Sequence, residues 1–221
     1  MIAKAALRAL AITGVLAALM LGLAGTVHWP GALLFLAAMA IGGFSMETWL
    51  IVNDPALYHE RHNTKQKKSR AERILLPLLN VTFFVWLLGM ALDVRVSGIW
   101  QMPLWVNVVA AAVVLTCFLL NITVFAANHF ASSIVRIQDG QQVATAGPYR
   151  IVRHPLYGIV VLTYFIIPFA LGSWSGLWGV PVLVLVLAIR TVCEEQLLLR
   201  DLPGYAEYCA KVRYRFLPLI W

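Results

Sequence analysis

The strongest chemical signal in the chain is a polar loop that leads into an apolar segment, running from Gly147 to Tyr157. A proline restricts the residue before it to extended conformations and fits well at the first position of a helix. His154 is therefore predicted to lie at the N-terminal lip of a helix that begins at Pro155, with Tyr157 on the same face one turn later. The unpaired amide hydrogens of such a helix end carry partial positive charge, which would stabilise the carboxylate of a ligand.

A second candidate group lies near the end of the last apolar segment, where Arg190 and Glu194 are four residues apart and share one helical face. Charged side chains inside a membrane are costly and by default indicate function. Glu194 could hold hydroxyl groups or positive charge of a ligand, and Arg190 could bind a carboxylate through two parallel hydrogen bonds. The alternative is that both charges mark the headgroup boundary of a membrane span, with Arg190 extended toward the interface. From charge alone, the boundary interpretation is favoured.

The elements that position these residues are predicted to lie in a membrane. Hydrophobic residues make up 61% of the 221 residues and charged residues only 12%, whereas a soluble domain carries about 25% charged residues. So few charges could not cover a water-exposed surface, but a bilayer removes that requirement. The three cysteines show no spacing typical of a zinc site, so no metal is predicted.

Six apolar runs approach the length of about 20 residues that a helix needs to cross a bilayer. They are residues 5–25, 29–52, 74–92, 103–127, 155–172 and 177–191. The last two are short and are separated only by residues 173–176, which predicts a tight helical hairpin. No segment alternates polar and apolar residues over the roughly ten positions of a barrel strand. The predicted fold is therefore an all-α integral membrane protein with six transmembrane helices.

The basic residues predict how these spans are oriented, because cytoplasmic loops are enriched in Lys and Arg. Of the 17 basic residues, Arg95 alone falls on one side of the predicted membrane. Of the other 16, six lie in the connection between the second and third spans, at Arg61, Lys65, Lys67, Lys68, Arg70 and Arg73. This asymmetry predicts cytoplasmic termini in a membrane of the bacterial inner type, and it argues against nucleic acid as a partner. The first segment could instead be a cleaved signal peptide, but its removal would leave this charge sorting unexplained.

The two longest polar connections, residues 53–73 and 128–154, both fall on the predicted cytoplasmic side. A cofactor pocket is therefore predicted there, where soluble cofactors are available. The chain is divided accordingly into an N-terminal region of four spans, residues 1–127, and a C-terminal catalytic region, residues 128–221.

The motifs in the C-terminal region are similar to those of a known family. The pattern G-P-Y-x-x-V-R-H-P-x-Y-G begins at Gly147, and R-x-x-x-E-E-x-x-L begins at Arg190 after the hydrophobic hairpin. They are followed by Y-x-x-Y from Tyr205 and V-x-Y-R-F-L-P from Val212. Together these motifs, within residues 128–218, resemble the isoprenylcysteine carboxyl methyltransferase family, and they are similar to the wider group that includes phospholipid N-methyltransferases. The stretch 54–61 is also similar to a segment of bacterial members.

The resemblance implies S-adenosylmethionine as methyl donor and a lipophilic methyl acceptor. Carried over by motif, the donor-binding residues are Gln138, Gln141, Gln142, Val143, Ala144, Tyr149, His154, Pro155, Leu156, Tyr157 and Glu194. Arg190 would face the acceptor, and Arg190, Glu194 and His154 are the catalytic candidates. The loop before Gly147 departs from the family pattern, because it is shorter than in eukaryotic relatives and has Gln141 where a histidine is common.

The implied reaction is methyl transfer from a sulfonium to an oxygen or nitrogen atom, and the favoured acceptor is the carboxylate of a prenylated cysteine. A carboxylate is ionised at neutral pH and needs no general base. An amine acceptor, as in a phospholipid N-methyltransferase, would require Glu194, Glu195 or His154 to act as base. A non-enzymatic transporter or scaffold is a further alternative, although the sequence shows no inverted repeat of the kind that transporters contain. The sequence does not indicate an oligomeric state.

Overall fold

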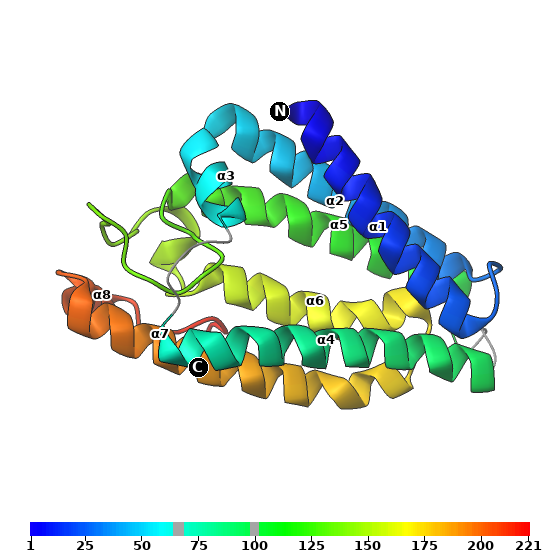
Figure 1. The fold of residues 1–221 in the computed structure, drawn as a ribbon. Helices are drawn as coiled ribbons and strands as arrows, with labels where there is room; N and C mark the ends of the chain where they lie inside the picture. The colour runs from blue at the N-terminus through cyan, green and yellow to red at the C-terminus, as the bar shows by residue number, and fades with distance from the viewer. Residues whose placement is uncertain (64–68, 98–101) are drawn as a thin grey trace.

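The computed structural model describes residues 1–63, 69–97 and 102–221, and in these ranges the chain is helical, with loops and one isolated bridge between Val152 and Tyr214 (Figure 1). The α-helices are α1 (Ile2–Ala24), α2 (Pro30–Asn53), α3 (Pro55–His62), α4 (Arg70–Ser97), α5 (Leu104–Ala127), α6 (Pro155–Leu171), α7 (Val180–Asp201) and α8 (Tyr205–Lys211). Two short 3-10 helices, η1 (Gly147–Arg150) and η2 (Ser175–Gly179), lie before α6 and α7.

Each of the six predicted apolar segments forms a helix, which confirms the all-helical prediction. Within the described part of the chain, five segments are long and apolar enough to cross a membrane: α1, α2, α4, α5 and the unit of η2 with α7. These helices indicate a multi-pass membrane protein. The fifth predicted span corresponds to α6, which is apolar but has only 17 residues, so the count of six spans stays a prediction. Lys65, Lys67 and Lys68 lie outside the described residues.

Helix α5 lies between α2 and α6 and packs against both. The last carbonyls of a helix have no partner within it, and side chains of two neighbouring elements bind those of α6. The amide Nδ2 of Asn107 donates to the carbonyl of Phe169 over 2.8 Å, and the indole Nε1 of Trp29 donates to the carbonyl of Leu171 over 2.9 Å. These contacts fix one end of α6 within the bundle.

The other face of the bundle is formed by α4 and α7, which pack against each other. The far end of α4 holds the connection between α6 and α7. Trp86 donates from Nε1 to the carbonyl of Gly176 over 2.6 Å, and Asp93 accepts from the hydroxyls of Ser173 and Ser175 over 3.1 and 2.6 Å. By this connection α4 sets the position of α7.

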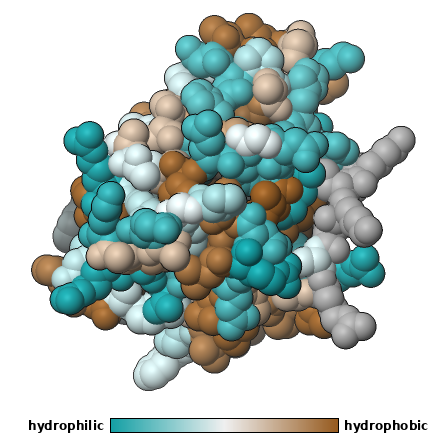
Figure 2. Space-filling model, turned by 90° about the vertical axis from the view of Figure 1, so that its left-hand side faces the viewer, coloured by the Kyte–Doolittle hydropathy of each residue, from teal (hydrophilic) through white to brown (hydrophobic). Residues whose placement is uncertain are grey.

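The loop between α5 and η1, α3 and α8 gather at the opposite end of the bundle, which is the left-hand end in Figure 1. Figure 2 shows this end, where polar side chains surround apolar ones. The C-terminal segment returns to the start of α6, since the amides of Arg153 and His154 donate to the carbonyls of Tyr214 and Arg215 over 2.9 and 2.7 Å. The predicted motif residues are thereby brought to one end of the molecule.

Candidate functional site

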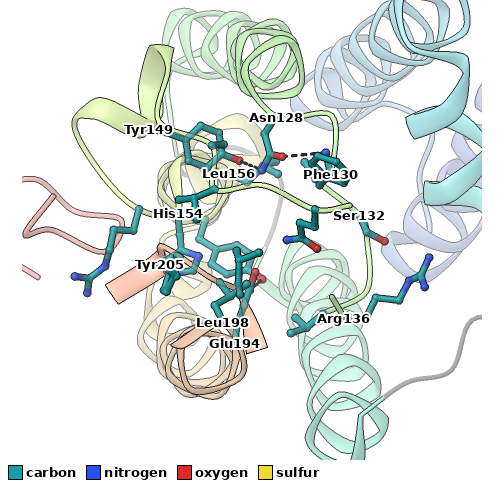
Figure 3. Close-up of a pocket in the computed structure, with 18 of the residues that line it drawn as sticks. Asn128, Phe130, Ser132, Arg136, Tyr149, His154, Leu156, Glu194, Leu198 and Tyr205 are labelled. Carbon is teal, nitrogen blue, oxygen red and sulfur yellow. Dashed lines mark hydrogen bonds between the residues drawn. The ribbon is translucent and has the colours of Figure 1, made fainter. Parts of the chain in front are cut away.

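A cavity of about 280 Å³ lies at this end of the bundle, between the loop of residues 128–144, α3, η1, α8 and the facing ends of α6 and α7 (Figure 3). Most of the residues predicted for the site line it: Gln141, Gln142, Val143, Ala144, Tyr149, His154, Leu156, Tyr157, Arg190 and Glu194. Two do not. Pro155 is buried in the first turn of α6, and Gln138 supports the loop by donating from Nε2 to the carbonyl of Phe130 over 2.8 Å.

His154 lies at the N-cap position of α6, as its place before Pro155 predicts. Its imidazole ring stacks on the Tyr157 ring, with 5.4 Å between ring centroids and 7° between ring planes. The backbone amide of His154 is fixed by the carbonyl of Arg215. The helix end and both rings therefore form one rigid wall of the cavity.

Glu195 fixes this wall from behind, in a role that sequence reasoning did not find. Its carboxylate accepts from Nε of Arg153 and from Nε of Arg215, each over 2.7 Å, and lies 3.3 Å from Nε2 of His154. Only 5% of Glu195 is exposed. The partners come from the start of α6 and from the C-terminal segment, and no short sequence spacing relates them to Glu195.

Glu194, one residue earlier, faces the cavity instead. Its Oε2 accepts a hydrogen bond from the hydroxyl of Tyr157 over 2.5 Å. Successive residues of a helix point about 100° apart, so two adjacent glutamates reach different surroundings. The carboxylate of Glu194 is thus held at the wall where His154 and Tyr157 stack.

Arg190 pairs with Glu72 of α4 and not with Glu194, which corrects the pairing that the spacing of four residues suggested. Nε and Nη2 of Arg190 donate to the two carboxylate oxygens of Glu72 over 3.2 and 2.7 Å, and Nη2 also donates to the carbonyl of Ser133 over 3.2 Å. Exposed fractions are 1% for Glu72 and 7% for Arg190. Among the described residues these contacts leave the two N–H groups of Nη1 unused, and the guanidinium lies 5.5 Å from the centroid of the Tyr157 ring.

The opposite wall is made by the loop after α5, which α3 holds in place. Arg61 donates from Nη1 to the carbonyl of Ala131 over 2.7 Å and lies over the ring of Phe125. Glu60 accepts from Nε of Arg136 over 3.0 Å. Arg61 itself lines the cavity, and burial lowers the pKa of its guanidinium. In the sequence, the signal that Arg61 lies near the site was the similarity of residues 54–61 to a segment of bacterial members of the family.

Aromatic side chains close the remaining side of the cavity. Tyr149 of η1 accepts at its hydroxyl from Nδ2 of Asn128 over 3.0 Å (Figure 3), and Tyr208 of α8 donates to the carbonyl of Tyr149 over 2.7 Å. Burial raises the pKa of Tyr149 to about 12, so its hydroxyl is neutral at physiological pH. Tyr205 and Leu198 complete this wall. The cavity therefore combines a flat aromatic and aliphatic side with a carboxylate, a helix N-terminus and a guanidinium.

No curated protein matches the chain. A family model does match, over residues 108–200, and this segment contains the His154 lip, the Tyr157–Glu194 hydrogen bond and Arg190. The matched segment ends before α8 and the C-terminal motif, which the predicted resemblance also covered. The model is that of the isoprenylcysteine carboxyl methyltransferase family, so the family resemblance predicted from the motifs is confirmed over residues 108–200.

Proposed function

We propose that this protein is an S-adenosylmethionine-dependent methyltransferase that methylates the carboxylate of an isoprenylcysteine-like acceptor. One observation carries the proposal. Glu194, the N-terminus of α6 and Arg190 with its unused donors line one cavity, and all three lie in the segment that matches this methyltransferase family.

The residues of the cavity fit the methyl donor chemically. Tyr149, Tyr205 and Leu198 offer flat and apolar surfaces to an adenine ring. Glu194 has the charge and the acceptor atoms to hold ribose hydroxyls or a cationic centre, and the start of α6 at His154 suits the carboxylate of the methionyl part. The cavity volume of about 280 Å³ lies near the lower end of the range of about 300–1,000 Å³ that is usual for small-molecule sites. When bound, the donor supplies an electrophilic methyl group on a sulfonium.

The acceptor carboxylate would bind to Arg190. Glu72 fixes the guanidinium plane, so that the free N–H groups of Nη1 have a set direction and one of them can donate to an acceptor carboxylate. A carboxylate acceptor is already ionised at neutral pH. The protein then contributes orientation and exclusion of water.

The surroundings of the possible general bases favour a carboxylate acceptor over an amine. Glu195 is occupied by Arg153 and Arg215, the imidazole of His154 faces Glu195, and Glu194 holds the hydroxyl of Tyr157. An amine would have to lose a proton to a base, and each carboxylate near the cavity is already a hydrogen-bond acceptor.

The topology belongs to the same proposal. We place the loop-rich end, with the cavity, in the cytoplasm, and count α6 as a sixth span that is short because it begins at the cavity. The described basic residues Arg61, Arg136, Arg153 and Arg215 lie at this end, whereas Arg95 lies in the last turn of α4 at the other. This distribution is the one expected for a cytoplasmic face.

Calorimetric titration of the detergent-purified protein with S-adenosylhomocysteine, the demethylated donor, tests the donor site. Saturable binding is expected, and Glu194→Gln should raise the Kd by about tenfold, the size of one lost charge-assisted hydrogen bond. His154→Ala removes the ring that stacks on Tyr157 and should also weaken binding. Glu207→Gln, at an exposed position on α8, is the matched control and should bind normally. Absence of binding by folded protein would refute the proposal.

Transfer of labelled methyl groups then tests the acceptor class. N-acetyl-S-farnesylcysteine should be labelled, whereas its carboxamide and phosphatidylethanolamine should not. Labelling of the phospholipid alone would replace carboxyl methylation with N-methylation.

A further inference from the structure

Four of the described residues that line the cavity of the candidate site are arginines, and three of them are paired with carboxylates. The pairs are Arg136 with Glu60, Arg153 with Glu195 and Arg190 with Glu72. The fourth, Arg61 of α3, contacts a carbonyl and an aromatic ring, and among the described residues no carboxylate lies within ion-pair distance of it. A cation that is partly withdrawn from water is normally paired with an anion. Among these four arginines, Arg61 is therefore the one whose charge is left for a ligand to compensate.

The guanidinium of Arg61 is held so that one edge stays free. Nη1 donates to the carbonyl of Ala131 over 2.7 Å, and Cζ lies 4.5 Å from the centroid of the Phe125 ring. Nε and Nη2 make no hydrogen bond to a described residue, and neither is among the fully buried polar atoms without a partner, so both are accessible to a ligand. The same two atoms of Arg190 bind both oxygens of Glu72. This edge of a guanidinium matches the two oxygens of a carboxylate.

Glu47 of α2 does not use this free edge. It acts on Arg61 electrostatically, but its Oε1 lies 2.9 Å from Nε2 of His62 and its Oε2 lies 3.9 Å from Nη1 of Arg8. Neither oxygen of Glu47 accepts a hydrogen bond from Arg61. The hydrogen-bonding capacity of Nε and Nη2 therefore remains for a ligand.

The surroundings of Arg61 indicate which part of a ligand would reach it. Phe125, below the guanidinium, belongs to an apolar cluster against which Leu156 packs, in the first turn of α6. The start of a helix also favours an anion. Arg61 and Glu194 both act on the hydroxyl of Tyr149 and have opposite effects on its pKa. The cavity therefore offers an unpaired guanidinium and a carboxylate to a ligand that carries both charges.

We propose that Arg61 binds the α-carboxylate of the methyl donor through Nε and Nη2. This inference rests on the proposed function. The methionyl part of the donor has a carboxylate that is ionised at neutral pH, together with an ammonium and a sulfonium. Arg190 remains available for the carboxylate of the acceptor. Helix α3 then contributes a binding residue to the donor site in addition to holding the loop after α5.

Two ligands that differ only in this carboxylate test the proposal without requiring turnover. S-adenosylhomocysteine carries the carboxylate, and S-adenosyl-3-thiopropylamine, its decarboxylated form, does not. Calorimetric titration of the detergent-purified protein gives the Kd of each. In the wild type, the Kd of the decarboxylated ligand should exceed that of S-adenosylhomocysteine by about tenfold or more, the value of a hydrogen bond between charged groups.

Three variants then assign this preference to a residue. In Arg61→Met the ratio of the two Kd values should fall by about tenfold, because only S-adenosylhomocysteine loses a partner. Arg61→Lys keeps the charge but not the two-pronged edge, and its ratio should lie between those of Arg61→Met and the wild type. Arg150→Met removes an exposed arginine of η1. It is the matched control and should keep the wild-type ratio.

A ratio near one in the wild type overturns the proposal, even if Arg61→Met fails to fold. An unchanged ratio in folded Arg61→Met also overturns it, because Arg61 would then serve only to support the loop at Ala131. The same titrations separate this inference from the proposed function. Binding of S-adenosylhomocysteine with a ratio near one refutes the Arg61 site alone, whereas binding of neither ligand by folded protein refutes the methyltransferase and the Arg61 site with it.

Discussion

Substitution of Glu72 by glutamine tests whether the Arg190 pair is the electrostatic anchor between α4 and α7. The change removes the negative charge but keeps one acceptor oxygen for the guanidinium. Both residues are almost fully buried, with 1% and 7% exposed. Breaking a buried ion pair costs about 3–5 kcal/mol, because the remaining charge is left without compensation. Since glutamine can still accept one of the two hydrogen bonds, we expect a loss of about 3 kcal/mol.

The assay is the free energy of unfolding in mixed micelles. It is measured for Glu72→Gln, for the single variants Glu72→Leu and Arg190→Met, and for the double variant Glu72→Leu/Arg190→Met. A buried pair that is replaced by apolar residues of similar volume is often neutral or stabilising. The double variant should therefore lie within about 1 kcal/mol of the wild type. Arg200→Ala removes an exposed pair with Asp201 and should leave stability unchanged.

Two results would contradict this reasoning. If Glu72→Gln left the unfolding free energy unchanged, the guanidinium would have another source of compensation. If the double variant were as unstable as the sum of the single variants, the loss would come from packing and not from unpaired charge.

Arg190→Lys keeps the positive charge but not the planar guanidinium. It should lower the rate of methyl transfer by about tenfold or more, while S-adenosylhomocysteine binds as in the wild type. A parallel loss of methyl transfer and of S-adenosylhomocysteine binding would contradict the role of Arg190 in binding the acceptor. Tyr149 has its pKa raised by burial to about 12 from an ordinary value of 10. Its neutral form is therefore favoured in the folded state, and the associated stability is fully present below pH 10 and lost as the pH rises toward 12. Tm measured from pH 9 to 12 should fall less steeply in Tyr149→Phe than in the wild type, and parallel curves would refute this contribution.

Local rules predicted the parts of the site that depend on neighbouring residues. Pro155 follows His154 directly, so the lip of α6 could be placed from conformational restriction alone. The helices followed from apolar length, although α4 and α7 extend beyond their apolar runs to Ser97 and Asp201. These extensions contain charged residues among apolar ones, so a search for continuous apolar runs ends before them.

Contacts between distant residues were not predictable in the same way. Arg190 and Glu194 share a helical face, so spacing suggested a pair, but Glu72 lies 118 residues from Arg190 and competes successfully because α4 packs against α7. Gln138 was assigned to the pocket by motif, yet its amide holds the loop at Phe130. The path of a loop depends on such hydrogen bonds, and a sequence motif does not specify them.

Substitutions of the adjacent residues Glu194 and Glu195 of α7 should separate an effect on ligand binding from an effect on the stability of the fold. Glu194 faces the cavity with one hydrogen bond from Tyr157, whereas Glu195 joins Arg153 and Arg215 behind the wall. Glu195→Gln should therefore cost about 2–3 kcal/mol of unfolding free energy, because two charge-assisted hydrogen bonds are weakened.

Glu194→Gln should leave the unfolding free energy near that of the wild type and raise the Kd for S-adenosylhomocysteine. Measuring both quantities for both variants distinguishes the roles, since the two substitutions are chemically identical and one residue apart. If Glu195→Gln also weakened binding of S-adenosylhomocysteine while the unfolding free energy was unchanged, Glu195 would act on the ligand directly and not through Arg153 and Arg215. The assignment of ligand binding to Glu194 and of stability to Glu195 would then be wrong, because that assignment rests on the different directions in which the two adjacent side chains point from the helix.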